Sequence, residues 1–361
     1  MSPTYKHHIA LLGGGTIGLS MTALHLRHPD TRVTIYDPRP DFEDQVHSIL
    51  PAFLDAPSAN TSTSEKQAIL TTLLSTARLT IAKTLQEAVQ NATIIQEQSP
   101  EQTASKQALW QEVTKYTDAD AHLWSSSSGI AASVQGALCG PAVVERLLVA
   151  HPFNPPHVMP LVEIVPGPAT KAERVEFVQG YFDGVPGPTV LGSGLNMNQA
   201  QAQAQAQQQQ SYYRPIVLHK EVPGFVGNRL AFALLREACY LVGEGVVSVR
   251  DLDALVKASL GPRWAGSGVF ESYHAGGGEG GIGAFLQKLA PTMKDVWGRL
   301  GQVDILVDGE RSDADDEGAE AWRKVVVRQA EEAYGPSTTA EDRQKKETML
   351  KGVVEMQNRL S

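Results

Sequence analysis

Cysteine and long apolar runs are both scarce in this chain. Its 361 residues include two cysteines, Cys139 and Cys239, far apart in the sequence, which is typical of reduced thiols in a cytosol-like compartment rather than of a disulfide-rich secreted protein. No stretch reaches the ~18 consecutive apolar residues that a membrane span needs. The first apolar run begins within ten residues of Met1 and leaves no room for a signal peptide, so we expect a cytoplasmic protein.

Positive charge is also in short supply. Lysine and arginine number 31 against 40 aspartates and glutamates, which gives a net charge of -9. A surface of this sign repels phosphate backbones, so nucleic acid and anionic membranes are excluded as main partners. Hydrophobic residues make up 42% of the chain, enough for about two domains with real cores.

The glycine-rich segment near the N-terminus is the most informative feature present. The apolar run 8–12 leads into a Gly-x-Gly-x-x-Gly motif and then into a helical pattern. In this arrangement the first glycine permits the tight turn, the second lets the backbone approach a pyrophosphate, and the third lets the helix pack on the strand. The helix N-terminus offers N–H groups to the phosphates. We therefore assign cofactor binding to Gly13, Gly14, Gly15, Thr16, Ile17 and Gly18.

An acidic residue follows at the spacing that such a site requires. The short run 32–36 ends at Asp37, which lies 19 residues after Gly18. A carboxylate there binds the adenosine ribose hydroxyls and repels the extra phosphate of NADP, so NAD is the predicted cofactor. Arg39, two residues further on, leaves NADP as the alternative.

The order of apolar runs and helical patterns predicts an α/β fold. Residues 7–167 alternate strands with helices, as in a Rossmann-type doubly wound sheet, and two helices joined by a polar linker are expected between Asp41 and Ala77. We expect an NAD-binding domain at 1–222 and an all-α domain for substrate binding and dimerisation at 223–361. Within the second domain, 225–243 and 249–259 are expected helices, Ser248 an N-cap and 275–281 a flexible loop. A low-complexity, Gln-rich insert at about 194–211 carries no predicted chemistry.

Candidate groups for proton transfer lie in two neighbouring strands. His151 is at the carboxyl end of one strand, the edge where open α/β sheets bind ligands, and Glu163 is in the next strand. Oxidation of an alcohol needs a base for the hydroxyl proton, and a carboxylate can fix the tautomer of a histidine that does so. A hydrogen-bonded core histidine and a salt-bridged glutamate remain the structural alternative. We expect no metal ligand set.

Several motifs of this sequence resemble those of the L-3-hydroxyacyl-CoA dehydrogenase superfamily. They are His-Pro-Phe-Asn-Pro-Pro at 151–156, the run to Pro166, and Val-Pro-Gly-Phe-Val-Gly-Asn-Arg-Leu at 222–230. The later segments 244–248 and 261–264 are similar to the branch of lambda-crystallin, which is L-gulonate 3-dehydrogenase, with carnitine dehydrogenase a cousin. The similarity covers residues 7–300 apart from the insert.

This resemblance implies a role for each matching residue. His151 would be the general base and Glu163 its orienting partner, while Ser128 and Asn228 would hold the substrate oxygen. Glu101, Lys106 and Asn154 would lie on the cofactor side. The departure at 125–129, Ser-Ser-Ser-Ser-Gly, changes the loop that carries Ser128. Glu101 and Lys106 could instead be a solvated helix start.

The substrate is inferred from charge. Residues 38–77 hold five acids, Asp41, Glu43, Asp44, Asp55 and Glu65, against Arg39 and Lys66. Because an acidic surface disfavours a polyphosphate ligand, we predict oxidation of a small L-3-hydroxy acid (L-gulonate-like) by a cytoplasmic homodimer. The alternatives are an L-3-hydroxyacyl-CoA dehydrogenase of fatty acid metabolism and a non-catalytic NAD(H)-binding structural protein.

Overall fold

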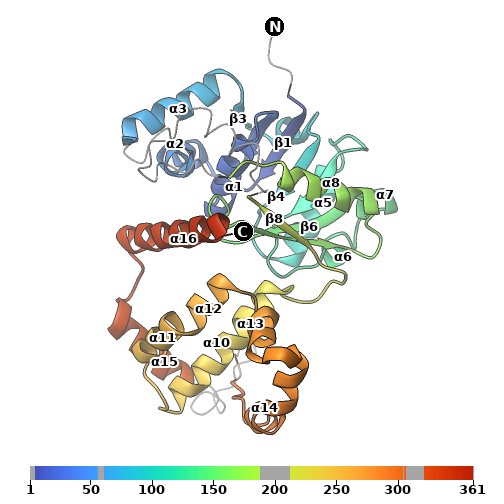
Figure 1. The fold of residues 1–361 in the computed structure, drawn as a ribbon. Helices are drawn as coiled ribbons and strands as arrows, with labels where there is room; N and C mark the ends of the chain where they lie inside the picture. Colours follow the sequence, from blue (N-terminus) through green and yellow to red (C-terminus); the bar gives the residue numbers. More distant parts are fainter. Residues whose placement is uncertain (1–4, 56–60, 188–211, 304, 306–320, 361) are drawn as a thin grey trace. The chain divides into compact units, whose positions relative to one another are not determined.

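Strand β1 (His7–Leu12) alternates its side chains between two hydrophobic cores. Ile9 and Leu11 belong to one core and Ala10 and Leu12 to the other, because successive strand residues point to opposite faces. A strand buried on both faces reads as a continuous apolar run, which is why 8–12 contains no alternation of polar residues. The first unit is therefore a sheet covered by helices on both sides (Figure 1).

The computed structural model describes residues 5–55, 61–187, 212–303, 305 and 321–360. The strands are β1, β2 (Thr31–Tyr36), β3 (Leu79–Ile81), β4 (Ile94–Glu97), β5 (His122–Ser125), β6 (Leu147–Pro152), β7 (Leu161–Pro166) and β8 (Arg214–Val217). Their order is β3-β2-β1-β4-β5-β6-β7-β8, parallel except for the antiparallel pair β6–β7. The predicted Rossmann-type α/β class is confirmed. The Gln-rich insert lies outside the described residues.

The helices of the first unit form two layers. They are α1 (Thr16–Arg27), α2 (Phe42–Phe53), α3 (Thr63–Ser75), α4 (Leu85–Val89), α5 (Thr103–Val113), α6 (Ala132–Gln135), α7 (Pro141–Val144) and α8 (Ala172–Asp183). Helices α1, α2 and α8 contribute to one core, through residues such as Leu24, Val46 and Phe182. Helices α4, α5 and α6 contribute to the other, with Trp110 fully buried.

The chain divides into two compact units, Met1–Val226 and Gly227–Ser361, and the boundary proposed after Val222 lies just before this division. The second unit is helical: α10 (Gly227–Gly243), α11 (Val249–Ala258), α12 (Leu260–Gly266), α13 (Val269–Gly276), η1 (Gly278–Gly280), α14 (Gly281–Trp297), α15 (Ala321–Tyr334) and α16 (Ala340–Leu360). The expected N-cap is confirmed, since Ser248 Oγ accepts a hydrogen bond from Asp251 N at 3.1 Å.

Two expectations for the second unit are wrong in detail. The segment 275–281 is not a loop: α13 runs to Gly276 and α14 begins at Gly281, with a 3₁₀ turn between them. Gly278 and Gly281 have φ of 59° and 54°, so this glycine run permits an abrupt change of direction between two helices. Helix α10 begins at Gly227 rather than at Phe225, because Phe225 has φ of 52°, outside the right-handed helical region.

A buried series of hydrogen bonds passes through His25 of α1 in the first unit. Its Nδ1 is 2.7 Å from the Tyr181 hydroxyl of α8 and its Nε2 is 2.7 Å from Gln96 Oε1 of β4. Since Gln96 Oε1 only accepts, His25 donates from Nε2 and Nδ1 accepts from Tyr181, so the ring is neutral. Burial, opposed by the hydrogen bond to Gln96, lowers the pKa of His25 to about 4. Burial and the charge of Arg174 lower the pKa of His122 to about 3.

We expect these histidines to make the first unit sensitive to acid. Below its ordinary pKa of about 6.5 the unfolded chain takes up a proton at His25, whereas the folded chain does not until about pH 4. Unfolding therefore consumes a proton in that window. The free energy of unfolding falls by up to roughly 1.4 kcal/mol for each pH unit of acidification there. Urea unfolding at pH 7, 6 and 5 measures the slope. A His25→Gln variant should show a shallower slope, and an equal slope would contradict this origin.

Candidate active site

The glycine-rich turn between β1 and α1 has the geometry that the sequence predicts. Gly13 has φ of 107° and donates its N–H to Tyr36 O of β2 at 2.9 Å. A Cβ on Gly18 would lie 1.9 Å from Gly13 O, so only glycine lets α1 pack this close to the strand. A Cβ on Gly14 would strike the Phe42 ring at 1.8 Å, a close approach to α2 that the motif alone does not show.

The amino end of α1 fits the pyrophosphate of a dinucleotide. A Cβ built on Gly15 meets no atom within 4 Å, so the backbone there faces open space. Thr16 and Ile17 form the first turn, and among the described residues no side chain caps this helix end. Helix N–H groups and the positive end of the helix dipole are thus presented to a ligand phosphate.

Asp37 lies beside this turn, as the spacing predicts. Its Oδ2 accepts a hydrogen bond from Gly14 N at 2.8 Å. Its carboxylate also binds the Arg39 guanidinium, with Arg39 Nε 2.7 Å from Oδ1. Burial alone would raise the pKa of the Asp37 carboxyl, but the hydrogen bonds from Arg39 and Gly14 outweigh burial and lower it. The carboxylate is therefore fixed and ionised next to the phosphate loop.

His151 and Glu163 lie directly opposite each other on the antiparallel pair β6–β7, so the expectation that adjacent strands bring them together is confirmed. His151 Nδ1 is 2.8 Å from Glu163 Oε2, and the side chains are 7% and 4% exposed. Glu163 Oε1 accepts a second hydrogen bond from Val226 N at 3.0 Å. This carboxylate holds the proton on Nδ1, so Nε2 is the ring atom that can take up a proton from a ligand.

Aromatic rings enclose the histidine. The ring centroid of His151 lies 5.0 Å from that of Phe153 and 5.7 Å from that of Phe225. Phe225 is fully buried. An imidazole between apolar rings is protected from water, and a hydrogen bond from its Nδ1 to a carboxylate is strengthened where the local dielectric is low.

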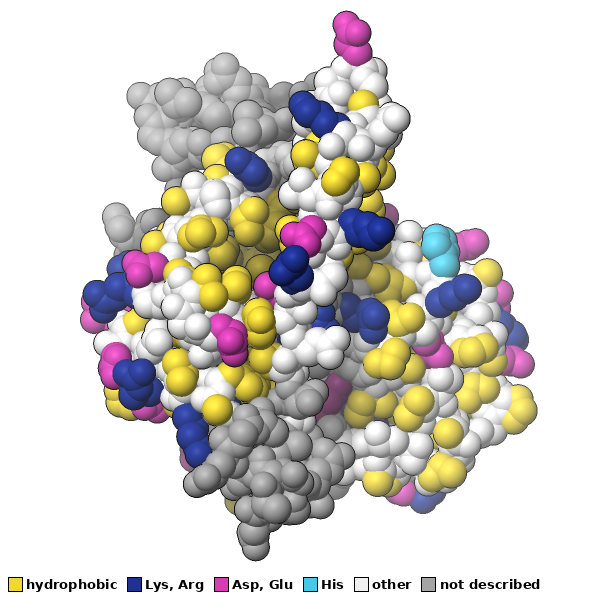
Figure 2. All heavy atoms as spheres, turned by 90° about the horizontal axis from the view of Figure 1, so that it is seen from below, with side chains coloured by type: hydrophobic (Ala, Val, Ile, Leu, Met, Phe, Trp, Pro, Cys, Tyr) yellow, Lys and Arg dark blue, Asp and Glu magenta, His cyan; other side chains and the backbone are white. Residues whose placement is uncertain are grey.

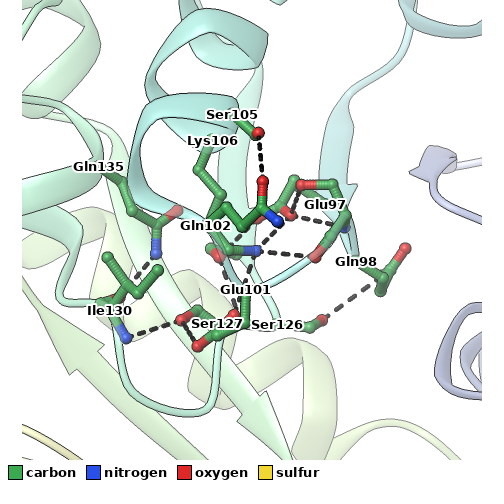
Figure 3. Close-up of polar contacts among 12 residues, drawn as sticks. Glu97, Gln98, Glu101, Gln102, Ser105, Lys106, Ser126, Ser127, Ile130 and Gln135 are labelled. Atoms are coloured by element: carbon green, nitrogen blue, oxygen red, sulfur yellow. Dashed lines mark hydrogen bonds and ion pairs between the residues drawn. The ribbon is translucent and has the colours of Figure 1, made fainter. Parts of the chain in front are cut away.

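A buried charged cluster occupies the ends of β4 and β5, and Figure 3 shows its members converging on Lys106 and Glu101. Lys106 Nζ contacts Glu97 Oε1 at 2.6 Å, Ser99 O at 3.1 Å and Glu101 Oε2 at 3.4 Å. The side chains of Lys106 and Glu97 are 1% and 0% exposed. The interpretation of Lys106 as part of a solvated helix start is therefore wrong, because the helix turns this residue into the core.

Glu101 organises the serine loop that follows β5. Its Oε1 accepts the backbone N–H groups of Ser128 and Gly129, each at 3.0 Å, and the hydroxyl of Ser127 at 2.5 Å. Burial acts to raise the pKa of Glu101, but the hydrogen bond from Ser127 and the charge of Lys106 prevail and lower it. An ionised Glu101 thus fixes the backbone at Ser128, the loop residue implied to contact the substrate.

Glu97 and Ser125 are members of this cluster that sequence reasoning missed. Ser125 Oγ donates to Glu97 Oε2 at 2.7 Å, and Ser99 Oγ donates to Glu97 Oε1 at 2.5 Å. A signal was available: Glu97 ends an apolar strand at the carboxyl edge of the sheet, where polar residues gather around ligands.

The predicted residues fall into three groups at this edge: the glycine turn with Asp37, the Lys106 cluster with Glu101 and Ser128, and the pair His151–Glu163. Asn154 is exposed in the turn between β6 and β7, before a cis peptide bond to Pro155. Asn228 is in α10 of the second unit. Across the described part of the chain no three His, Cys, Asp or Glu side chains are grouped to hold a metal ion. No helix described there is long and apolar enough to cross a membrane.

Comparison with known proteins decides the family. The family model "3-hydroxyacyl-CoA dehydrogenase, NAD binding domain" matches residues 8–208, and the model of the C-terminal domain matches 224–300. The chain belongs to the 3-hydroxyacyl-CoA dehydrogenase family. It binds NAD and is an oxidoreductase that acts on the CH–OH group of a small hydroxy acid.

Relatives cover most of the chain. L-carnitine dehydrogenase of Mesorhizobium japonicum is 33% identical over 313 residues, 85% of this chain and 76% of that protein. L-carnitine dehydrogenase of Streptomyces coelicolor is 33% identical over 319 residues, 87% of this chain and 86% of that protein. A solved structure of 5-formyl-3-hydroxy-2-methylpyridine 4-carboxylic acid 5-dehydrogenase, 21% identical, matches with a TM-score of 0.67 and covers 98% of both chains. At this identity the structural match supports the fold alone.

Proposed function

We propose that this 3-hydroxyacyl-CoA dehydrogenase family member oxidises the 3-hydroxyl of a small, free L-3-hydroxy acid to the 3-keto acid. The observation that carries the proposal is the buried pair His151–Glu163 at 2.8 Å, on the sheet edge that also holds the dinucleotide turn. A base whose tautomer is fixed by a carboxylate is the group that alcohol oxidation requires.

Proton transfer is assigned to His151. Its Nε2 takes the hydroxyl proton as the C3–O bond becomes a carbonyl, and Glu163 stabilises the imidazolium through Nδ1–H. When bound, NAD would supply the acceptor for the hydride from C3. The alcohol, having lost one proton and one hydride, is then the ketone, and His151 holds the proton. Ser128, held by Glu101, and Asn228 are the proposed contacts of the substrate oxygen.

The cofactor is assigned to the groups around the glycine turn. Its pyrophosphate binds at Gly13–Gly18 and the α1 N-terminus, and its adenosine ribose at Asp37. Glu101, in contact with Lys106, fixes the serine loop 125–129. Asn154 lies at the same carboxyl edge of the sheet.

The acidic residues of segment 38–77 support a free-acid substrate less strongly than the composition suggests, because several of them have partners. Asp55 is paired with Arg27 at 2.9 Å, Glu43 forms an ion pair with Lys83, and Glu65 caps α3 in a capping box with Ser62. The two ion pairs reduce the acidic excess without making the surface basic, so it still offers little attraction to the phosphates of a CoA ester.

The substrate is tested by NADH formation at 340 nm with L-gulonate, L-carnitine and L-3-hydroxybutyryl-CoA. The sequence motifs favour a gulonate-like acid, and the names of the relatives favour carnitine; activity with either free acid supports the proposal. Activity with the CoA ester alone overturns the free-acid proposal, and inactivity with all three removes L-gulonate and L-carnitine from it.

A cytoplasmic homodimer completes the proposal. Helix α10 exposes Leu230, Phe232 and Leu235, at 62%, 61% and 54%. Figure 2 shows hydrophobic side chains scattered among polar ones on the face that it draws. Exposed apolar patches of this kind mark association surfaces. Sedimentation equilibrium of the preparation used for activity gives the number of copies, and the mass of one chain would remove the dimer from the proposal.

A further inference from the structure

We call the surroundings of Asp37, where the adenosine ribose is proposed to bind, the ribose corner. The Asp37 carboxylate there already binds an arginine, Arg39. Asp37 accepts four hydrogen bonds: from Gly14 N at 2.8 Å, and from Arg39 N, Nε and Nη2 at 3.0, 2.7 and 2.9 Å. A carboxylate offers about four acceptor positions. Two ribose hydroxyls can therefore bind Asp37 only if the Arg39 side chain gives up its two.

Arg39 has other contacts that can keep it near the corner. Its Nη1 donates to Gln45 Oε1 at 2.9 Å, and its guanidinium carbon lies 5.9 Å from the centroid of the Phe42 ring. Phe42 packs against Gly14 of the phosphate turn, so this ring fixes the place of the arginine relative to the dinucleotide. The Arg39 side chain is 42% exposed and that of Asp37 is 9% exposed, so the arginine is the partner that can move.

The charges at this corner cancel. An unpaired carboxylate repels a 2′-phosphate, but a carboxylate that is paired with a guanidinium presents no net charge. A guanidinium carries five N–H donors, so Arg39 can bind a phosphate while part of its fork stays on Asp37.

We propose that Arg39 is a specificity-determining arm that lets this site bind NADP as well as NAD. With NAD, the ribose hydroxyls replace the guanidinium on Asp37. With NADP, the guanidinium binds the 2′-phosphate and keeps one hydrogen bond to Asp37, so that the carboxylate stays paired, while Phe42 and Gln45 hold its position. The inference rests on the placement of the adenosine ribose at Asp37 in the proposed function, and it requires no particular substrate.

Direct binding tests the arm, with NADH and NADPH titrated by their own fluorescence in the absence of substrate. We expect wild-type dissociation constants for the two within about tenfold of each other. Arg39→Ala should bind NADH several-fold more tightly and NADPH at least ~tenfold more weakly, because a charge-assisted contact is lost. Asp37→Asn should reverse the preference in favour of NADPH. Arg39→Lys keeps the charge without the fork and should fall between wild type and Arg39→Ala.

Arg32→Ala is the matched control, since it removes an exposed arginine of β2 that contacts His8 and should leave both constants unchanged. Opposite changes for the two cofactors in Arg39→Ala support the arm; parallel changes or no change overturn it. Tight NADH binding without turnover of any 3-hydroxy acid would contradict the proposed function and leave the arm intact.

Discussion

Replacing His151 by glutamine is expected to lower kcat by about 10²–10⁴-fold with the dissociation constant for NADH unchanged. Within the assigned pair the imidazole is the group that can take up the hydroxyl proton, because Glu163 already accepts hydrogen bonds from His151 and Val226. Glutamine keeps a polar side chain of similar reach but has no basic atom. Steady-state kinetics on the best free acid, with NADH titration alongside, measures both effects.

Glu163→Gln separates positioning from base chemistry. It removes the charge that stabilises the imidazolium, so we expect a loss of kcat smaller than that of His151→Gln. His219→Gln is the matched control, because His219 is exposed in the same unit and has no assigned role. An unchanged kcat in His151→Gln would contradict the base assignment. An unchanged kcat in Glu163→Gln would reduce Glu163 to a packing role.

Lys106→Met is expected to destabilise the first unit by about 3–5 kcal/mol, the cost of leaving a buried charge without its partner. The substitution keeps the length of the side chain, yet Glu97 then lies fully buried with hydrogen bonds from Ser125 and Ser99 but no cation. Glu101 loses the same cation, so the loop at Ser128 should loosen as well. Urea unfolding followed by the fluorescence of the buried Trp110 and Trp124 reports the change.

The control for this prediction comes from the same region of the chain. Lys115→Met removes an equal charge from an exposed pair with Glu112 and should leave the unfolding midpoint unchanged within error. The double variant Glu97→Gln/Lys106→Met removes both buried charges and should recover part of the loss, since a neutral amide costs less to bury. Equal midpoints for Lys106→Met and wild type would show that Lys106 does not stabilise the cluster.

Local patterns were sufficient where a backbone conformation or a sheet edge dictated the residue. The roles of Gly13 and Gly18 follow from steric limits that act within a few residues, and the structure shows both. The pairing of His151 with Glu163 was predictable because two strands joined by a short turn must run side by side. The glycine run 275–281 misled for the same reason: glycine permits a helix end as readily as a loop, and the local sequence does not distinguish them.

The sequence by itself determined the fold class, the dinucleotide turn, the carboxylate at Asp37 and the histidine–glutamate pair, because each depends on periodicity or spacing along the chain. Only the tertiary structure decided which charges meet. Burial of Lys106 against Glu97 and the hold of Glu101 on the serine loop depend on side-chain directions and on distances between elements, and the bidentate contact of Arg39 with Asp37 depends on the direction of the Arg39 side chain. Whether two such groups meet depends on how the surrounding side chains pack, and no spacing rule along a chain encodes that packing.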